Sequence, residues 1–219
     1  MELMRTSFFL LTLMVFFLPA TSFASSLNTE ASAPATIFTT MQPTGNDIGV
    51  SKITPSSSLY FLKTLREVLE LNLALTSRTK MFRQLEFATR RLREAKSLIP
   101  TNRQDLIAQT LERYWFHINI LEGDNLKDQE VATRVKEGLV VHLEVLEQIY
   151  DQVTNSSAKI AIRSMVNRLS GRVDLPAFAK LSACSFLSKE SSASGLLEVE
   201  KEILFERARS CFKLAGYKF

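Results

Sequence analysis

The sequence predicts an all-α protein, an antiparallel bundle of about five long helices followed by a C-terminal helical hairpin. The 219 residues include only 7 Gly and 6 Pro. Residues 56–99 contain neither, and no Pro occurs between residues 101 and 175. Apolar residues recur at every third or fourth position through these stretches, which is the spacing of one helix face and not the alternation of a strand.

The first two predicted helices lie on either side of residue 76. Thr54 is the expected N-cap of the first, with Pro55 at its first helical position, and this helix runs to about Leu75. The second begins near Ser77 and ends before Pro100. Both carry an apolar stripe that we expect to face the core, formed by Leu59, Leu62, Leu65, Leu69 and Leu73 in the first and by Met81, Leu85, Ala88, Leu92, Ala95 and Ile99 in the second.

The remaining helices follow from similar signals. Thr101 and Gln104 have the spacing of a capping box, and they open a third helix that ends near Leu121. A fourth, over about 125–153, carries its inward stripe from Val131 to Tyr150, and a fifth starts after Asn155 and closes at Gly171. A short sixth helix begins near Pro176, and a seventh runs from a cap at Ser194 to about Leu214.

The N-terminus has the pattern of a secretory signal peptide. Arg5 precedes an apolar run over residues 7–18, and Ser22 and Ala24 satisfy the small-residue rule for cleavage between Ala24 and Ser25. An uncleaved signal anchor is the alternative interpretation. The sequence favours it less, because the apolar run has about a dozen residues and a spanning helix needs roughly 20. The sequence therefore predicts an exported protein, periplasmic, extracellular or associated with the cell envelope.

The predicted domain organisation follows from these boundaries. Residues 1–24 form the signal peptide, 25–52 a flexible linker rich in Ser, Thr and Pro, 53–170 the helical bundle, and 171–219 a helical hairpin packed on it. The formal net charge is +4, and it stays +4 when the signal is removed, because Glu2 and Arg5 leave together. Nucleic-acid binding normally requires a much stronger basic footprint, so no nucleic-acid partner is expected.

Several segments resemble an uncharacterised bacterial family of exported or membrane-tethered helical domains of unknown function. These segments are residues 55–63 (PSSSLYFLK), 73–76 (LALT), 85–95 (LEFATRRLREA) and 142–148 (HLEVLEQ), and the resemblance spans roughly residues 53–170. The family's usual proline after the fourth helix is replaced here by Thr154, Asn155 and Ser156. Some members occur in proteins that resemble anti-sigma factors, and the resemblance implies fold and compartment without implying catalytic residues.

The chain has two cysteines, Cys184 and Cys211, and export would place them where a disulfide persists. If the sixth helix continued through Lys189, the two cysteines would lie at different distances from the turn between the sixth and seventh helices. Their Cα atoms would then be too far apart for a bridge. A disulfide therefore requires that helix to stop near Cys184, with residues 185–193 running back as an extended strap. Separate thiols are the alternative.

No catalytic set or metal site is recognisable in the sequence. Ser77 with Lys80, and Ser156 with Lys159, match the short SxxK spacing, but no KTG motif accompanies either pair. His117 and His142 are the two histidines, neither belongs to a zinc-binding spacing, and we expect His142 to be a hydrogen-bonded core residue. No enzyme activity, cofactor or metal is therefore expected.

The predicted second helix is rich in basic residues, and together with an aromatic it supplies a candidate partner face. This face would consist of Arg83, Arg90, Arg91, Arg93 and Phe116, the last because three consecutive aromatics cannot all point inward. A solvated face matched by acidic neighbours is the alternative.

The leading hypothesis is a non-enzymatic interaction module for another envelope or extracellular protein or a surface polymer. A membrane-anchored sensor or anti-sigma-like module is the second hypothesis, and an envelope enzyme without a recognisable motif is the third. Membrane contact is expected only if the signal is retained, and self-association is left open.

Overall fold

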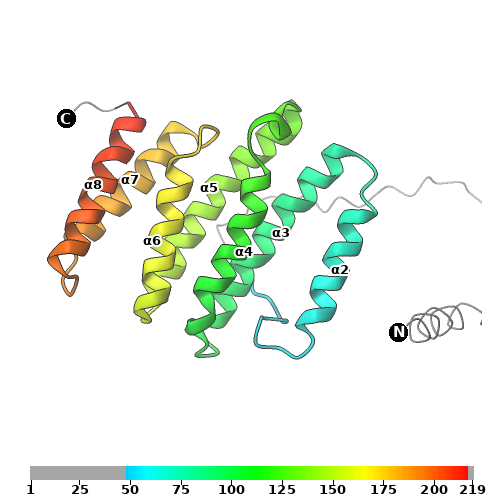
Figure 1. The fold of residues 1–219 in the computed structure, drawn as a ribbon, viewed down its shortest axis with the longest axis horizontal. Coiled ribbons are helices and arrows are strands. Elements are labelled where there is room, and N and C mark those ends of the chain that lie inside the picture. The colour runs from blue at the N-terminus through cyan, green and yellow to red at the C-terminus, as the bar shows by residue number, and fades with distance from the viewer. Residues whose placement is uncertain (1–47, 217–219) are drawn as a thin grey trace, which may run out of the picture. The chain divides into compact units, whose positions relative to one another are not determined.

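The computed structural model describes residues 48–216, and within that range it contains helices and no strand, which confirms the all-α prediction (Figure 1). This range also contains short 3₁₀ turns at Gln104–Leu106 and Gly123–Leu126. The predicted signal peptide, its cleavage point between Ala24 and Ser25, and most of the predicted linker lie outside the described residues. The helices are α2 (Tyr60–Asn72), α3 (Ser77–Leu98), α4 (Ile107–Ile120), α5 (Gln129–Gln152), α6 (Ser156–Ser170), α7 (Ala177–Ser191) and α8 (Glu198–Leu214).

The helices after α2 pack as successive hairpins. Each of the pairs α3 with α4, α5 with α6, and α7 with α8 is joined by a short connection and is in contact, and α6 also contacts α7. The hairpins then stack side by side, because α3 contacts α5, α5 contacts α7, α4 contacts α6 and α6 contacts α8 (Figure 1). The helix α2 lies against α3 at the end of this stack.

The core is built from the stripes that the sequence predicts for the middle helices. On α4 and just after it, Ile107, Leu111, Tyr114, Ile118 and Leu121 are buried. The predicted stripe of α5, from Val131 to Tyr150, is also buried, and α6 adds four further apolar residues. These four are Ile162, Met165, Val166 and Leu169. Ile160, also on α6, is 51% exposed.

Side-chain caps fix where three of the helices begin. Thr76 accepts a hydrogen bond from the Thr79 amide at the start of α3, and Asn155 accepts one from the Ala158 amide at the start of α6, as the sequence predicts for Asn155. Asp128 accepts from two amides at the start of α5. The predicted capping box of Thr101 and Gln104 is wrong. The Oε1 atom of Gln104 instead accepts from the Thr154 and Asn155 amides, each at 2.9 Å, and joins two connections of the chain.

The expectation about α2 is wrong in two respects. The helix begins at Tyr60 and not at Thr54, because residues 54–59 form turns. Its leucine stripe, expected in the core, points to solvent, and the helix packs on α3 through its polar side. The predicted cap at Ser194 is also wrong, since α8 begins at Glu198 after Leu197.

The two cysteines lie at disulfide distance, although the path of the chain between them differs from the prediction. The Sγ atoms of Cys184 and Cys211 are 2.06 Å apart, and their Cα atoms are 5.4 Å apart. The helix α7 does not stop at Cys184 but continues to Ser191, so the expected extended strap is absent between residues 185 and 191. The six residues 192–197 instead form the connection that sets the level of α8 against α7.

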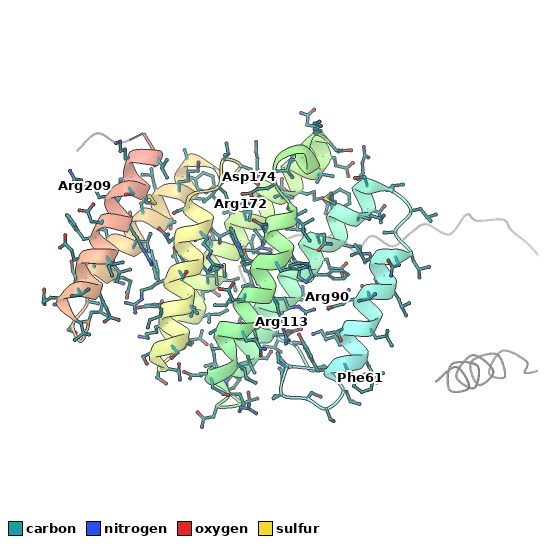
Figure 2. The ribbon with its side chains drawn as sticks, viewed as in Figure 1. Phe61, Arg90, Arg113, Arg172, Asp174 and Arg209 are labelled. Atoms are coloured by element: carbon teal, nitrogen blue, oxygen red, sulfur yellow. A yellow bond between two sulfur atoms is a disulfide. The ribbon has the colours of Figure 1, made fainter. Side chains whose placement is uncertain are left out.

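Arg172, in the connection between α6 and α7, is buried at the C-terminal end of α4 (Figure 2). Its guanidinium donates to the carbonyl oxygens of Ile118 and Leu121. It also contacts the carboxylate of Asp174, with an Nη2 to Oδ2 distance of 2.8 Å, and that of Glu122. A cation at this position adds hydrogen bonds to the carbonyls at the end of α4 and complements the negative end of the helix dipole.

Candidate interaction surface

The helix α2 has an apolar side and a polar side, and the apolar side faces away from the protein. Successive helical residues are rotated by about 100°, so Leu65 and Glu67 point to nearly opposite sides. Glu67 is buried against α3, and Leu65 is exposed. We call the exposed side the α2 apolar face. It consists of Phe61, Leu62, Leu65, Val68, Leu69 and Leu73, each 48 to 76% exposed.

The polar side of α2 enters a buried charge cluster formed by Tyr60, Lys63 and Glu67 of α2 with Arg91 and Glu94 of α3. Arg91 forms ion pairs with both Glu67 and Glu94. The Nζ atom of Lys63 lies 2.6 Å from the Glu94 carboxylate. The Tyr60 hydroxyl donates to Glu94 at 3.0 Å and accepts from Arg91 at 2.7 Å. Each of the five polar groups therefore has a partner on the other helix.

A second layer of ion pairs lies beside this cluster. Arg90 of α3 contacts Glu70 of α2 at 3.0 Å and Glu86 of its own helix at 2.6 Å (Figure 2). The guanidinium of Arg113, on α4, lies 5.2 Å from the centre of the Tyr60 ring. The helix α2 is thus attached to α3 and α4 mainly by charged and polar groups.

Burial changes the protonation behaviour of the cluster. Burial raises the pKa of Glu67, and the nearby guanidinium groups of Arg91 and Arg90 offset only part of this rise. Burial, followed by the Glu94 carboxylate, also raises the pKa of Tyr60. Charged groups that lose water need well-placed partners, so the cluster favours one orientation of α2 over a rotated one.

The segment that leads into α2 is attached to the same part of α3. The carbonyl of Ile48 accepts from the Arg93 side chain, and the Ser51 amide donates to the Ser97 hydroxyl at 2.7 Å. Lys63 of α2 then donates to the Ser51 hydroxyl and to the Ile53 carbonyl. The end of the predicted linker, residues 48–52, therefore packs against α3 and helps to hold α2 in place.

The structure distributes the sequence-predicted partner residues among different environments. Arg91 is buried, with a side chain only 4% exposed, and Arg90 is mostly buried, because both bind the carboxylates of α2. Arg93 binds the Ile48 carbonyl, and burial lowers its pKa. Arg83 pairs with Glu86 at the surface. The four arginines therefore do not form an open basic face, whereas Phe116 is 63% exposed, as the sequence predicts.

Both histidines are engaged inside the protein. His142 is buried, with Nε2 2.9 Å from the Thr89 hydroxyl and Nδ1 3.4 Å from that of Tyr114, which agrees with the predicted core histidine. Burial lowers its pKa to about 3. His117 Nδ1 lies 2.7 Å from Oε1 of Gln84, and burial followed by the charge of Arg91 lowers the pKa of His117 to about 4. Both rings are therefore neutral near pH 7.

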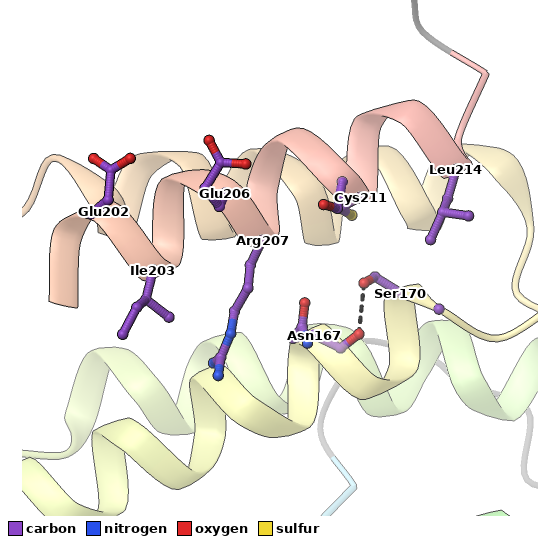
Figure 3. A pocket seen from close by; sticks show the side chains of 10 residues that line it. Asn167, Ser170, Glu202, Ile203, Glu206, Arg207, Cys211 and Leu214 are labelled. Carbon is purple, nitrogen blue, oxygen red and sulfur yellow. Dashed lines mark hydrogen bonds between the residues drawn. The ribbon is translucent and has the colours of Figure 1, made fainter. Parts of the chain in front are cut away.

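The structure also contains an open groove between α6 and α8 (Figure 3). Its volume is about 570 Å³. Ile203, Arg207 and Leu214 of α8 and Asn167 and Ser170 of α6 are among the residues that line it. Among residues 48–216, no group of three His, Cys, Asp or Glu side chains is arranged to hold a metal ion. No helix within this range has the length and apolar character needed to cross a membrane.

The comparison with protein families matches the part of the chain that contains α2. Residues 52–156 match the family described as a domain of unknown function, DUF5667. This segment is similar to that family, and it makes up just under half of the chain. It includes α2 to α5, and therefore the α2 apolar face and the buried charge cluster, and it ends where α6 begins. The search of curated proteins and the search of solved structures gave no significant match to the chain.

The sequence did not reveal that α2, the first helix of the matched segment, has its apolar side facing outward. The pattern of α2 shows a leucine stripe and an opposite side with Lys63, Glu67 and Glu70. It does not show which side meets α3. The available signal was the position of Arg90 and Arg91 on α3, because these arginines need acidic partners if they are buried.

Proposed function

We propose that the chain is an exported, non-enzymatic interaction module and that the α2 apolar face is its docking surface. The observation that carries the proposal is the orientation of α2, which buries charged groups and exposes apolar ones. Apolar burial drives folding and association, so a helix in this orientation leaves a large favourable contact unused. A partner that covers the α2 apolar face would bury these apolar side chains and so gain that contact.

The size of the exposed area supports this interpretation. A whole leucine or phenylalanine residue offers roughly 200 Å², so the exposed fractions correspond to a face of about 600 Å². The largest apolar patch on a typical monomer is about 300–600 Å² and is often functional. The face also lies on one regular helix, which presents it as a continuous stripe.

The polar groups of the domain support a non-catalytic role. The histidines are neutral and bonded to neighbouring side chains. The charged groups of the cluster are paired with one another, so they hold the helices in position. This arrangement is typical of a structural ion-pair network.

Export is supported by the sequence and by the cysteines. The signal pattern ends at Ala24, and Cys184 and Cys211 lie at disulfide distance, which suits an oxidising compartment. N-terminal sequencing of the protein recovered from the cell envelope or the medium tests the export proposal. We expect a start at Ser25. A protein that retains residues 1–24 would favour the membrane-anchored alternative, and one found only in the cytosol would contradict export.

Photo-crosslinking in the producing cell tests the docking surface. A photoreactive phenylalanine analogue replaces Leu65 at the centre of the α2 apolar face, and in a control protein it replaces Ile160 on α6, which has a similar exposed fraction. We expect irradiation to give a discrete protein adduct from position 65 and none from position 160. Equal labelling at the two positions, or no adduct at position 65, would contradict the docking role of α2.

A further inference from the structure

We infer that the occupant of the α2 apolar face is the same face of a second copy of this chain, so that two α2 helices pack against each other across a two-fold axis. This inference rests on the proposed function, because it names the partner of the proposed docking surface. Three properties of the face support it: its area, its charge and the spacing of its residues.

The area suffices for a reversible dimer. Two faces of about 600 Å² bury about 1,200 Å² together, and specific protein interfaces bury roughly 1,200–2,000 Å². The estimate lies at the lower end of that range before the flanking residues are counted. A self-association in the micromolar range is therefore expected, and not an obligate dimer.

The charges of α2 favour a neutral protein surface over an anionic membrane. The four charged residues of the helix are Lys63, Arg66, Glu67 and Glu70, and their charges cancel. Arg66 pairs with Glu70 at 2.6 Å, and Lys63 and Glu67 are occupied in the buried charge cluster. Two copies therefore approach without net repulsion. A helix that lies on a membrane surface normally carries lysines and arginines around its apolar side, and α2 has no such basic excess.

The spacing of the face suits a helix partner. Leu62, Leu65 and Leu69 follow one another by three and four positions, and Asn72 and Leu73 continue the same side. This alternation produces the seam along which two helices interlock their side chains. An identical helix supplies the same seam. In a two-fold pair each α2 apolar face covers the other, so no apolar face is left to bind a third copy.

The position of α2 at the end of a stack of helices gives a further reason. The terminal element of a stacked helical array ordinarily has a polar outer side, which stops further addition. The outer side of α2 is apolar instead. The α2 helix of a second copy, placed on this apolar side, continues the stack of helices into that copy. In each copy the polar side of α2 remains buried against α3.

Sedimentation equilibrium of the purified protein tests this inference. Between about 1 and 200 µM, we expect the average mass to rise from one chain toward two. The double variant Leu65→Glu and Leu69→Glu should remain monomeric, because glutamate preserves helix propensity but places charge in the seam. Ile160→Glu on α6 is the matched control and should dimerise as the unchanged protein does. Circular dichroism must show equal helix content in all three proteins.

Cysteine crosslinking identifies the contact independently. Leu65 lies near the middle of α2, so a cysteine introduced there approaches its own copy in a two-fold helix pair, and both native cysteines already lie at disulfide distance from each other. We expect Leu65→Cys to form a covalent dimer on mild oxidation and Ile160→Cys to remain a monomer.

Two results would overturn the self-association. One is a monomeric mass throughout the concentration range, and the other is unchanged dimerisation of the double glutamate variant. In the cellular crosslinking experiment, an adduct at position 65 with the mass of two chains supports the inference. An adduct with a different protein or with lipid overturns it, although a different protein at that position would still agree with the proposed docking function.

Discussion

Arg91 shows how much of the arrangement of α2 depends on single charged side chains. Its guanidinium is buried between the carboxylates of Glu67 and Glu94, which come from two different helices. A buried ion pair adds little compared with a well-packed apolar substitute, but removing one partner leaves the other charged and without water. The cluster therefore specifies how α2 is attached more than it adds to overall stability.

We expect Arg91→Leu to lower the free energy of unfolding by about 3–5 kcal/mol, because it leaves two buried carboxylates without their main cation. Urea unfolding followed by circular dichroism measures this change. Arg66→Ala is the comparison, since it removes a largely exposed arginine that pairs with Glu70 on the same helix, and it should cost about 0.5 kcal/mol or less. Similar losses for the two variants would show that Arg91 is not the central cation of the cluster.

At the scale of single elements, α2 shows which part of the site could be predicted from sequence. The amphipathic pattern correctly locates a helix with a leucine stripe, because periodicity reports where apolar residues point relative to one another. It does not report which side contacts the rest of the protein. The same limit explains why Arg90 and Arg91 were predicted as part of a partner face. Their acidic partners lie on α2, about 20 residues earlier in the chain, and the sequence pattern does not show that this side of α2 meets them.

The helices α7 and α8 carry the two cysteines that lie at disulfide distance. The bridge of Cys184 and Cys211 has a sequence separation of 27 residues. Closing a loop of this length reduces the conformational freedom of the unfolded chain by about 3.5 kcal/mol in the chain-entropy model. Sequence reasoning placed the cysteines correctly on the two helices but could not determine the route of residues 192–197, which allows α7 to continue past Cys184.

We expect the double variant Cys184→Ala and Cys211→Ala to lose about 3.5 kcal/mol of unfolding free energy, because its unfolded chain lacks the closed loop. Guanidinium unfolding of the variant and of the unchanged protein, each with and without reductant, measures the loss. Reductant should destabilise the unchanged protein and leave the variant unaffected. A sensitivity to reductant that is the same in both proteins would contradict the contribution of the bridge.

For the whole molecule, the sequence predicts the all-α class and most of the apolar helix faces that point into the core. It succeeds for α4 and α5 because these helices lie between neighbours on several sides, so their apolar residues have no alternative to the core. It fails at α2, at the end of the stack, where one side of the helix remains exposed to solvent. A prediction from periodicity is therefore most accurate where an element is surrounded by others.

The buried histidines make the stability of the whole fold depend on pH. Burial lowers the pKa of His142 to about 3, against about 6.5 in an unfolded chain. Because the unfolded chain binds the proton more readily, the stability due to the neutral ring is complete above pH 6.5 and is lost as the pH falls toward 3. For one proton, the free energy of unfolding changes by at most about 1.4 kcal/mol per pH unit. The raised pKa of Glu67 acts in the opposite direction, since acid then favours the folded chain.

We expect His142→Gln to reduce the slope of unfolding free energy against pH between pH 6.5 and 4. The variant should be less stable at pH 7, because it loses ring contacts with Thr89 and Tyr114, so the slope and not the absolute value is diagnostic. Urea unfolding at several pH values measures both quantities. Parallel curves for the two proteins would show that His142 does not take up a proton on unfolding.

The guanidinium of Arg172 has a consequence for where this protein can be divided. The DUF5667 match ends at residue 156, yet the last carbonyls of α4, inside that segment, are satisfied by a side chain 16 residues beyond its boundary. The apolar side of α4 is likewise completed by α6. We therefore expect a fragment that ends at residue 156 to be less stable than the longer chain, because it would lack both α6, which packs on α4, and the cation at the C-terminal end of α4.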